Sequence, residues 1–298
     1  LGDKNLSPLW EVYEKLVVSE PQRSEPSVIW KWADMLPQIE QSAELVHGKD
    51  ADHRVLLMNN PHLDGPPATT SHMIAAYQCV LPGEQTSPHR HTPAATRIIL
   101  EGTGGGTFVD GKRCDMYDGD LIFTPNWTWH NHHNDSNGRT IWVDVLDLPL
   151  VGRMDAIFGQ MSKPEDEEYP GNNQVLHHSW SRMSTALADA APGSYGVRSI
   201  DYVEPGDGTP ILATLDSRAA ALAPGKGTRT RSMASELFII LEGAGESEIG
   251  DATHQWGPKD VFTVPHWSWA CHKASTDARF IVISDRNILK RLNLYREE

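Results

Sequence analysis

The sequence predicts an all-β protein made of two copies of one β domain, with a helical segment in front of them. The chain has 298 residues, about twice the ~150 residues of an average domain. Short apolar segments alternate with turn signals such as Pro82-Gly83, Asp110-Gly111 and Asn137-Gly138, which is typical of an antiparallel sandwich or barrel. Part of the first half also returns in the second half, which indicates a duplication.

Composition and charge exclude several classes of protein. The hydrophobic share of 39% and the charged share of 22% are ordinary for a globular protein. The formal net charge is -14, and Lys and Arg form no run, so we expect no nucleic-acid partner and no anionic membrane surface. The longest apolar stretches have the length of strands, so no membrane span is expected.

The cysteines and the N-terminus predict the compartment. Cys79, Cys114 and Cys271 are odd in number and far apart, which fits neither a disulfide framework nor a Cys-x-x-Cys metal clip. Residues 1–9 show no basic region followed by an apolar one, so no signal peptide is expected. Both observations favour a reducing cytoplasm.

The helical segment is predicted over residues 1–52. Ser7 is typical of an N-cap and Pro8 of a first helical residue, and the apolar residues from Leu9 to Leu16 follow at helical spacing. A second helical or turn-rich piece is expected over Trp30 to Val46.

Two blocks of sequence carry the duplication. Ile98 to Gly102 returns unchanged as Ile239 to Gly243, and Asp120 to Trp129 returns in similar form as Asp260 to Trp269. The two offsets agree to within one residue, which makes chance a poor explanation. The chain therefore carries two copies of one β domain.

The copies set the expected domain limits. The first β domain begins with the apolar run His53 to Met58 and is predicted over residues 53–151. Residues 152–195 hold an acidic loop and a Pro-Gly turn, so we expect a linker there. The second β domain is predicted over residues 196–298.

Comparison of the copies separates scaffold from chemistry. What both copies keep is expected to serve the fold, so Trp127 and Trp129, which recur in the second copy, are interpreted as packed aromatic anchors. Three histidines of the first copy, His89, His91 and His130, have no counterpart in the second. Residues lost together in one copy are expected to serve chemistry.

The three histidines predict a metal site. Side chains at i and i+2 of a strand lie on one face, so His89 and His91 point the same way, and His130 from a neighbouring strand completes the set. Three neutral imidazoles leave coordination positions open, which suits a catalytic metal that also binds substrate. The alternative is that they are surface or core histidines without a ligand.

Two motifs resemble those of the cupin superfamily. Gly83 to Gly102 is similar to the first cupin motif and Gly119 to Asn134 to the second, which implies two double-stranded β-helix (jelly-roll) barrels, a bicupin. Ala95 stands where the first motif usually has Glu, so a three-His-one-Glu site is disfavoured. Glu236 occupies that place in the second copy without histidine partners and is interpreted as a structural leftover.

Motifs along almost the whole chain resemble the gentisate 1,2-dioxygenase group of bicupins, which includes salicylate and 1-hydroxy-2-naphthoate dioxygenases. They include Pro8 to Val12, Leu81 to Glu84, His89 to Thr92, Thr124 to His132 and Asp144 to Leu150. The resemblance implies one Fe(2+) in the first cupin domain and a second cupin domain without metal. It also implies a homo-oligomer, a tetramer or a dimer.

The reaction that the resemblance implies is extradiol-type cleavage of an aromatic ring by O2. The implied substrate is an ortho-hydroxybenzoate, gentisate or a 5-substituted salicylate, opened between its carboxyl-bearing and hydroxyl-bearing carbons during aromatic hydrocarbon catabolism. One alternative is a 1-hydroxy-2-naphthoate dioxygenase. The others are a non-oxygenase metal cupin, such as a Zn or Mn isomerase or decarboxylase, and a binding protein.

Further site residues follow from the same resemblance. Arg97 matches an arginine that binds the substrate carboxylate, and His132 matches a catalytic histidine near the metal. Asp144 is expected to support one of them, against the alternative of a purely structural pair. Gln78 and Arg54 are expected to contact substrate, with ordinary polar lining as the alternative.

A local difference bears on the substrate. The chain has Ile74 near the place where the family often has an aromatic residue in the pocket wall. A smaller side chain there is expected to admit a bulky ring substituent, so halo- or nitrosalicylates join gentisate as candidates.

Overall fold

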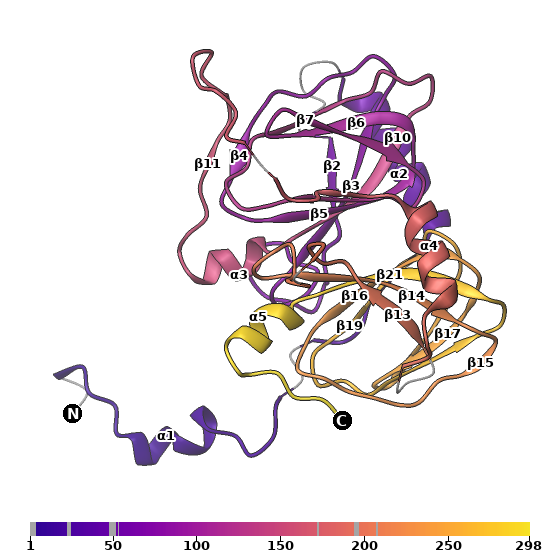
Figure 1. Cartoon of the computed structure of the whole chain (residues 1–298). Helices are drawn as coiled ribbons and strands as arrows, with labels where there is room; N and C mark the ends of the chain where they lie inside the picture. Colours follow the sequence, from indigo (N-terminus) through magenta and orange to yellow (C-terminus); the bar gives the residue numbers. More distant parts are fainter. Residues whose placement is uncertain are drawn as a thin grey trace.

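The structure is a computed structural model that describes residues 4–22, 25–47, 52, 54–171, 173–193, 197–206 and 208–298. Two β barrels lie one above the other, and a helical arm at the N-terminus extends away from them (Figure 1). The prediction of an all-β bicupin with an N-terminal helical segment is confirmed. The predicted start of the first strand, His53, lies outside the described residues.

The first barrel combines a six-stranded sheet, a three-stranded sheet and a short two-stranded ribbon. The six-stranded sheet has the order β12-β8-β5-β10-β3-β2, and the smaller sheets are β7-β6-β9 and β11-β4. The strands are β2 (Val55–Leu57), β3 (Ile74–Val80), β4 (Arg90–His91), β5 (Ala95–Glu101), β6 (Thr103–Val109), β7 (Lys112–Tyr117), β8 (Leu121–Thr124), β9 (His130–His133), β10 (Thr140–Leu146), β11 (Gly159–Gln160) and β12 (His177–His178).

The second barrel repeats this plan. Its six-stranded sheet has the order β1-β19-β16-β21-β14-β13, and its four-stranded sheet has the order β15-β20-β17-β18. The strands are β1 (Ile29–Trp30), β13 (Arg198–Asp201), β14 (Asp216–Leu222), β15 (Gly225–Lys226), β16 (Glu236–Glu242), β17 (Gly245–Ile249), β18 (Ala252–Trp256), β19 (Val261–Val264), β20 (Ala270–Ala274) and β21 (Ala278–Ser284).

Five helices accompany the strands in the described part of the chain. They are α1 (Leu9–Leu16), α2 (Trp32–Leu45), α3 (Leu148–Arg153), α4 (Trp180–Asp189) and α5 (Arg286–Arg291). The second predicted helical piece corresponds to α2. The predicted cap of α1 is wrong by one residue, because Pro8 is extended and takes the N-cap position in place of Ser7.

The barrels exchange the short strands that precede them in the chain, β1 and β12, which we call their arms. Strand β1 precedes the first barrel in the chain but pairs with β19 of the second, and β12 precedes the second barrel but pairs with β8 of the first. The helices that follow are anchored alike, because Trp32 N donates to Asp260 Oδ1 at 2.7 Å and Trp180 N donates to Asp120 Oδ1 at 2.8 Å. The duplication therefore includes these arms, and the domain limits remain a prediction.

The central strands of both six-stranded sheets, β5 and β10 in the first and β16 and β21 in the second, are buried on both faces. Leu237, Ile239 and Ile281 join the apolar cluster of the first barrel, whereas Phe238 and Ile240 point the other way and fill the second barrel. A sheet buried on both faces needs continuous apolar runs instead of alternating ones. This explains the Ile-Ile-Leu runs that both copies keep.

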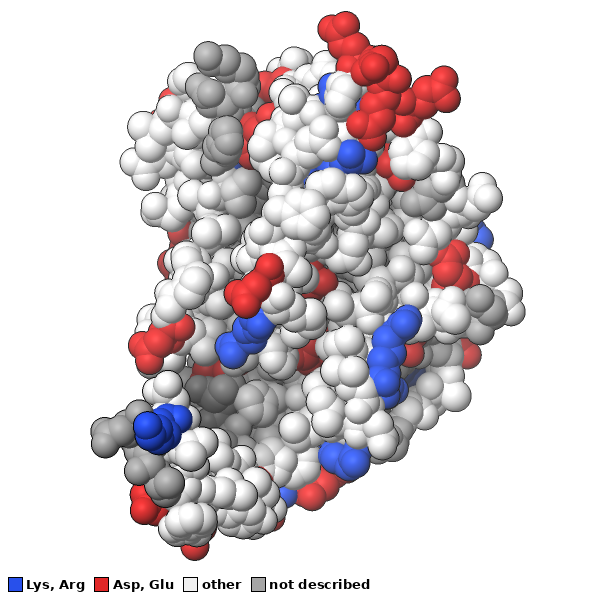
Figure 2. All heavy atoms as spheres, turned by 90° about the vertical axis from the view of Figure 1, so that its left-hand side faces the viewer, with Lys and Arg blue, Asp and Glu red and all other residues white. Residues whose placement is uncertain are grey.

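The surface shows no continuous basic patch on the face drawn in Figure 2, where acidic side chains gather at one end and Lys and Arg are scattered. This distribution agrees with the net charge of -14. Among the helices that the structure describes, none combines the length and apolar character that crossing a bilayer requires.

Candidate metal centre

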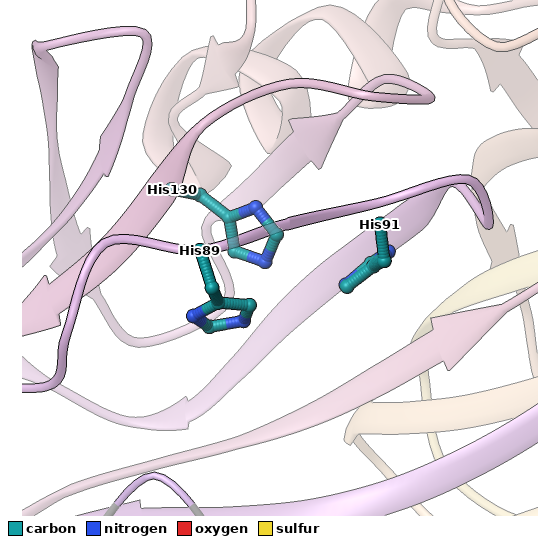
Figure 3. Close-up of side chains that lie close together, drawn as sticks. All are labelled: His89, His91 and His130. Carbon is teal, nitrogen blue, oxygen red and sulfur yellow. The ribbon is translucent and has the colours of Figure 1, made fainter. Parts of the chain in front are cut away.

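The three predicted ligands meet in the first barrel. His91 lies in β4, His89 precedes that strand, and His130 begins β9. A bridge between His89 and His130 joins the two segments, and the three rings face one another (Figure 3). One ring nitrogen from each residue lies within 4.8 Å of the others. The described residues thus place three imidazoles where one ion would contact all of them.

Hydrogen bonds orient each ring for ligation. The Nδ1 atoms of His89, His91 and His130 lie 3.0, 2.7 and 2.9 Å from the backbone carbonyl oxygens of Ser87, Pro93 and Thr128. A carbonyl oxygen only accepts, so each Nδ1 carries the proton and each Nε2 keeps its lone pair. Fixing the tautomer in this way is what a metal-binding histidine requires.

Burial keeps the imidazoles neutral. Desolvation lowers the pKa of His89, lowers that of His91 to about 4, and lowers that of His130 well below its ordinary value. The positive charge of Arg97 acts in the same direction on all three. Neutral imidazole is the form that binds a metal, so no proton competes at neutral pH.

The cavity beside these rings holds most of the other predicted residues. It has a volume of about 200 Å³, and Gln78, Arg97, His132 and Asp144 line it together with the three histidines. Ile74, the position expected to admit a ring substituent, also lines it. Residues from β3, β5, β9 and β10 therefore converge on one site.

Arg54 does not reach this cavity. It is 1% exposed, and its guanidinium donates to Glu84 at 2.7 Å and to the backbone oxygens of Cys79 and Val46. These contacts tie α2 to the turn before β4 and give Arg54 a structural place. Because Arg54 does not line the cavity, the structure gives no support to its predicted contact with substrate.

Arg97 and Asp144 form a buried ion pair in the cavity wall. Their side chains are neighbours on β5 and β10, with Arg97 Nε 2.9 Å from Asp144 Oδ1. The two atoms are not aligned for a hydrogen bond, and Arg97 also donates to Thr124. Trp142 Nε1 holds Asp144 Oδ2 at 2.7 Å. The guanidinium thus keeps donor capacity for an anionic group in the cavity.

His132 lies on the same strand as His130 and faces the cavity. Its Nδ1 is 2.9 Å from Thr107 Oγ1, and burial holds its pKa well below the ordinary value. The second barrel repeats this contact, since His272 Nδ1 is 2.7 Å from Ser247 Oγ. Sequence reasoning missed this correspondence, although His132 and His272 are separated by the offset of the repeat.

The Trp-x-Trp pair clamps an arginine. The Arg90 guanidinium lies over the rings of both Trp127 and Trp129, 4.7 and 4.3 Å from their centroids. It also donates to Glu167 at 2.9 Å and Gln160 at 2.7 Å. Because Arg90 lies between His89 and His91 in the chain, this clamp holds the segment that carries both predicted ligands.

A residue that sequence reasoning missed, Asp52, also lines the cavity. Its Oδ2 accepts from Ser87 N at 3.0 Å, and its Oδ1 is buried with no hydrogen-bond partner among the described residues. Asp52 does not belong to the group of possible metal ligands. It lies before the repeated blocks, so no pattern in the sequence signalled it.

Comparison with known proteins agrees with this geometry. Residues 76–146 match the family model described as "Cupin domain". The chain is 32% identical to gentisate 1,2 dioxygenase 1 of Aquipseudomonas alcaligenes, over 100% of this chain and 94% of that protein. It is 31% identical to 5-aminosalicylate 1,2-dioxygenase of Comamonas sp, over 99% of this chain and 87% of that protein.

Solved structures give the same result. Salicylate 1,2-dioxygenase from Pseudaminobacter salicylatoxidans superposes with a TM-score of 0.90 at 28% identity, covering 100% of this chain and 94% of that one. These relatives do not favour the isomerase, decarboxylase or binding-protein alternatives. The chain belongs to the gentisate 1,2-dioxygenase family of cupin ring-cleaving dioxygenases.

Proposed function

We propose that the protein uses one Fe(2+), held by His89, His91 and His130, to cleave an ortho-hydroxybenzoate with O2. The extradiol-type cleavage falls between the carboxyl-bearing and hydroxyl-bearing ring carbons. The observation that carries this proposal is that the three free Nε2 lone pairs and the Arg97 guanidinium face one cavity. A ferrous ion with open positions supplies the site where both the aromatic acid and O2 are activated.

The residues of the chain prepare the substrate for this chemistry. Arg97 binds the substrate carboxylate through its remaining donors, and Asp144 holds the guanidinium in place. His132 is neutral and hydrogen-bonded to Thr107. A ring nitrogen of His132 exchanges a proton with the phenol group of the substrate. Gln78, which is 6% exposed, adds a polar contact in the wall. Holding both reacting groups in one orientation lowers the entropic cost of the reaction.

We propose gentisate as the substrate, and one unpaired oxygen in the cavity wall supports this choice. Gentisate carries a second hydroxyl at ring position 5, and Asp52 offers a buried carboxylate oxygen that lacks a donor. A hydroxyl group satisfies this oxygen, whereas a halo or nitro group leaves it unpaired at a cost. Ile74 lines the same cavity, as expected for a residue beside the substituent. Salicylates with a 5-amino group share this donor and are the second choice.

Oxygen uptake tests the proposed function. The protein is stripped of metal, reconstituted anaerobically with Fe(2+), and supplied with gentisate and O2. We expect O2 uptake in equal amount to the gentisate consumed and a new absorbance of the ring-opened product. Reconstitution with Zn(2+) serves as the control. Uptake that is absent with all ortho-hydroxybenzoates and 1-hydroxy-2-naphthoate, in a sample shown to contain iron, contradicts the proposal.

We also propose that the chain forms a homo-oligomer, a dimer or a tetramer, in the cytoplasm. Support comes from α1, which buries none of its residues and leaves Leu9, Trp10, Tyr13 and Leu16 at least 52% exposed. An apolar face of this kind is typical of a contact with another subunit. Light scattering of the whole chain and of a chain lacking residues 1–20 measures the assembly, and a monomeric whole chain contradicts it.

A further inference from the structure

The second barrel encloses a cavity of its own. Its volume is about 230 Å³, against about 200 Å³ for the cavity at the three histidines. The inner faces of β14, β16 and β21 contribute Ala220, Phe238, Phe280 and Val282 to its wall. The barrel without histidine ligands therefore keeps as much open space as its partner.

This cavity lies at the place of the metal site. Thr230 N donates to Ala270 O at 2.9 Å, which is the pairing that joins His89 to His130 in the first barrel. Ser232, two residues after Thr230, corresponds in the same way to His91. All three replacements line the cavity. Small hydroxyl and methyl side chains in place of imidazoles remove the metal ligands and leave the space.

A new polar pair faces this space. Arg218 Nη2 lies 2.5 Å from Glu236 Oε1, and their side chains are 16% and 18% exposed. The strand registers place this pair where the first barrel has Ala76 and Ala95. Glu236 is thus part of an ion pair that the first barrel lacks, instead of a structural leftover. The wall consequently offers a strong donor and a strong acceptor side by side.

An unpartnered hydroxyl also lines the cavity. Ser268 is 4% exposed, and its Oγ has no hydrogen-bond partner among the residues that the structure describes. A buried hydroxyl without a partner costs free energy, so its presence in a cavity wall points to a polar group from outside the chain.

Two aromatic rings, Phe238 and Phe280, also line the cavity. Their centroids are 5.4 Å apart. Phe238 is stacked on Phe262, which lies outside the lining, with centroids 4.8 Å apart and an angle of 10° between the ring planes. Flat apolar surfaces of this kind favour a planar ligand. A dry cavity of about 150 Å³ holds benzene, so 230 Å³ has room for a ring with polar substituents.

We propose that the second barrel binds a small hydroxy-substituted aromatic acid without any metal ion. The ring rests against Phe238 and Phe280, the carboxylate accepts from Arg218, and the hydroxyl donates to Glu236. Ser268 completes the polar contacts. This assigns a binding site to the barrel that carries no metal ligands, and it does not depend on the substrate proposed for the first barrel.

Calorimetric titration with 3-hydroxybenzoate tests this site. Its hydroxyl and carboxylate are not adjacent, so it cannot form the ortho chelate expected in the first barrel. Metal-loaded protein is used, and we expect one ligand bound per chain. Ala220→Leu fills the second cavity and is expected to weaken binding at least about tenfold while leaving gentisate turnover unchanged. Ala76→Leu, which narrows the first cavity, is the matched control and is expected to leave binding unchanged.

Two results overturn the proposal. One is that the wild-type protein fails to bind 3-hydroxybenzoate at millimolar concentration. The other is that Ala76→Leu loses binding and Ala220→Leu keeps it, which places the probe in the first barrel. Because Ala220→Leu can fail to fold, a crystal of the wild-type protein soaked with 3-hydroxybenzoate gives a second measurement. Density between Arg218 and Phe238 supports the site, and density in the first barrel alone overturns it.

Discussion

At the scale of single residues, the two buried arginines of the first barrel have different tasks. Arg97 and Arg54 are 3% and 1% exposed, and each is paired with a carboxylate. Only Arg97 lines the cavity of the three histidines. The sequence could not separate them, because both match polar positions of the family and the direction of a side chain depends on the strand that carries it.

Replacement of Arg97 tests this assignment. Arg97→Met removes the charge proposed to bind the substrate carboxylate. The loss of a charge-assisted hydrogen bond of about 1.5–3 kcal/mol corresponds to a KM about 10- to 100-fold higher. Arg54→Met is the matched control, for which we expect a lower melting temperature and an unchanged KM. Steady-state O2 uptake measures both variants, and an unchanged KM in Arg97→Met removes the proposed role.

Asp52 is expected to govern the choice of ring substituent. Asp52→Ala removes the unpaired carboxylate oxygen, so the ratio of kcat/KM for gentisate to that for salicylate should fall about tenfold. The ratio should fall because kcat/KM for gentisate falls, since salicylate has no group at ring position 5 and should be turned over as before. If the ratio is unchanged, Asp52 does not contact the ring, and it acts only on Ser87.

At the scale of elements, the duplication provides a matched pair for the Trp–Arg–Trp clamp. In the second barrel the Arg231 guanidinium lies over the rings of both Trp267 and Trp269, 4.3 and 4.7 Å from their centroids, as Arg90 lies over its two rings in the first. Both clamps hold equivalent segments, because Thr230 pairs with Ala270 as His89 pairs with His130, but only the segment of Arg90 carries the proposed metal ligands.

The two clamps should therefore respond differently to the same change. Arg90→Met is expected to weaken Fe(2+) binding about 10- to 100-fold, as the loss of a group that supports a metal ligand commonly does. Arg231→Met is expected to leave Fe(2+) affinity unchanged. Both variants are expected to lower the melting temperature by a similar amount. Competition with a chelator measures the affinity. Equal iron affinity in both variants would show that the clamp serves the fold alone.

The histidine that the repeat keeps in the second barrel makes stability depend on pH. Burial lowers the pKa of His272 to about 4, whereas an unfolded chain has the ordinary histidine pKa near 6.5. Between these values the unfolded state binds the extra proton, so the free energy of unfolding falls as the pH drops from about 6.5 to 4. His272→Gln should make this decline shallower. Thermal unfolding between pH 7 and 4 checks it, and an identical decline in both proteins contradicts it.

At the scale of the whole molecule, the sequence predicted the barrels better than their connections. The repeated Ile-Ile-Leu and Asp-to-Trp blocks are long and buried, so their pattern survives in both copies. The exchanged arms rest on β1 and β12, two residues each, which carry no detectable periodicity. Spacing predicted the meeting of His89, His91 and His130, but Asp52 and the Arg218–Glu236 pair depend on which way single side chains turn.

The proposed function requires one ferrous ion in the first barrel and none in the second. Anomalous scattering at the iron absorption edge, measured on crystals of the anaerobically reconstituted protein, locates the iron. We expect one peak, within bonding distance of the Nε2 atoms of His89, His91 and His130, and no peak between Thr230 and Ala270. A peak in the second barrel, or no peak beside the three imidazoles, rules out this placement of the iron.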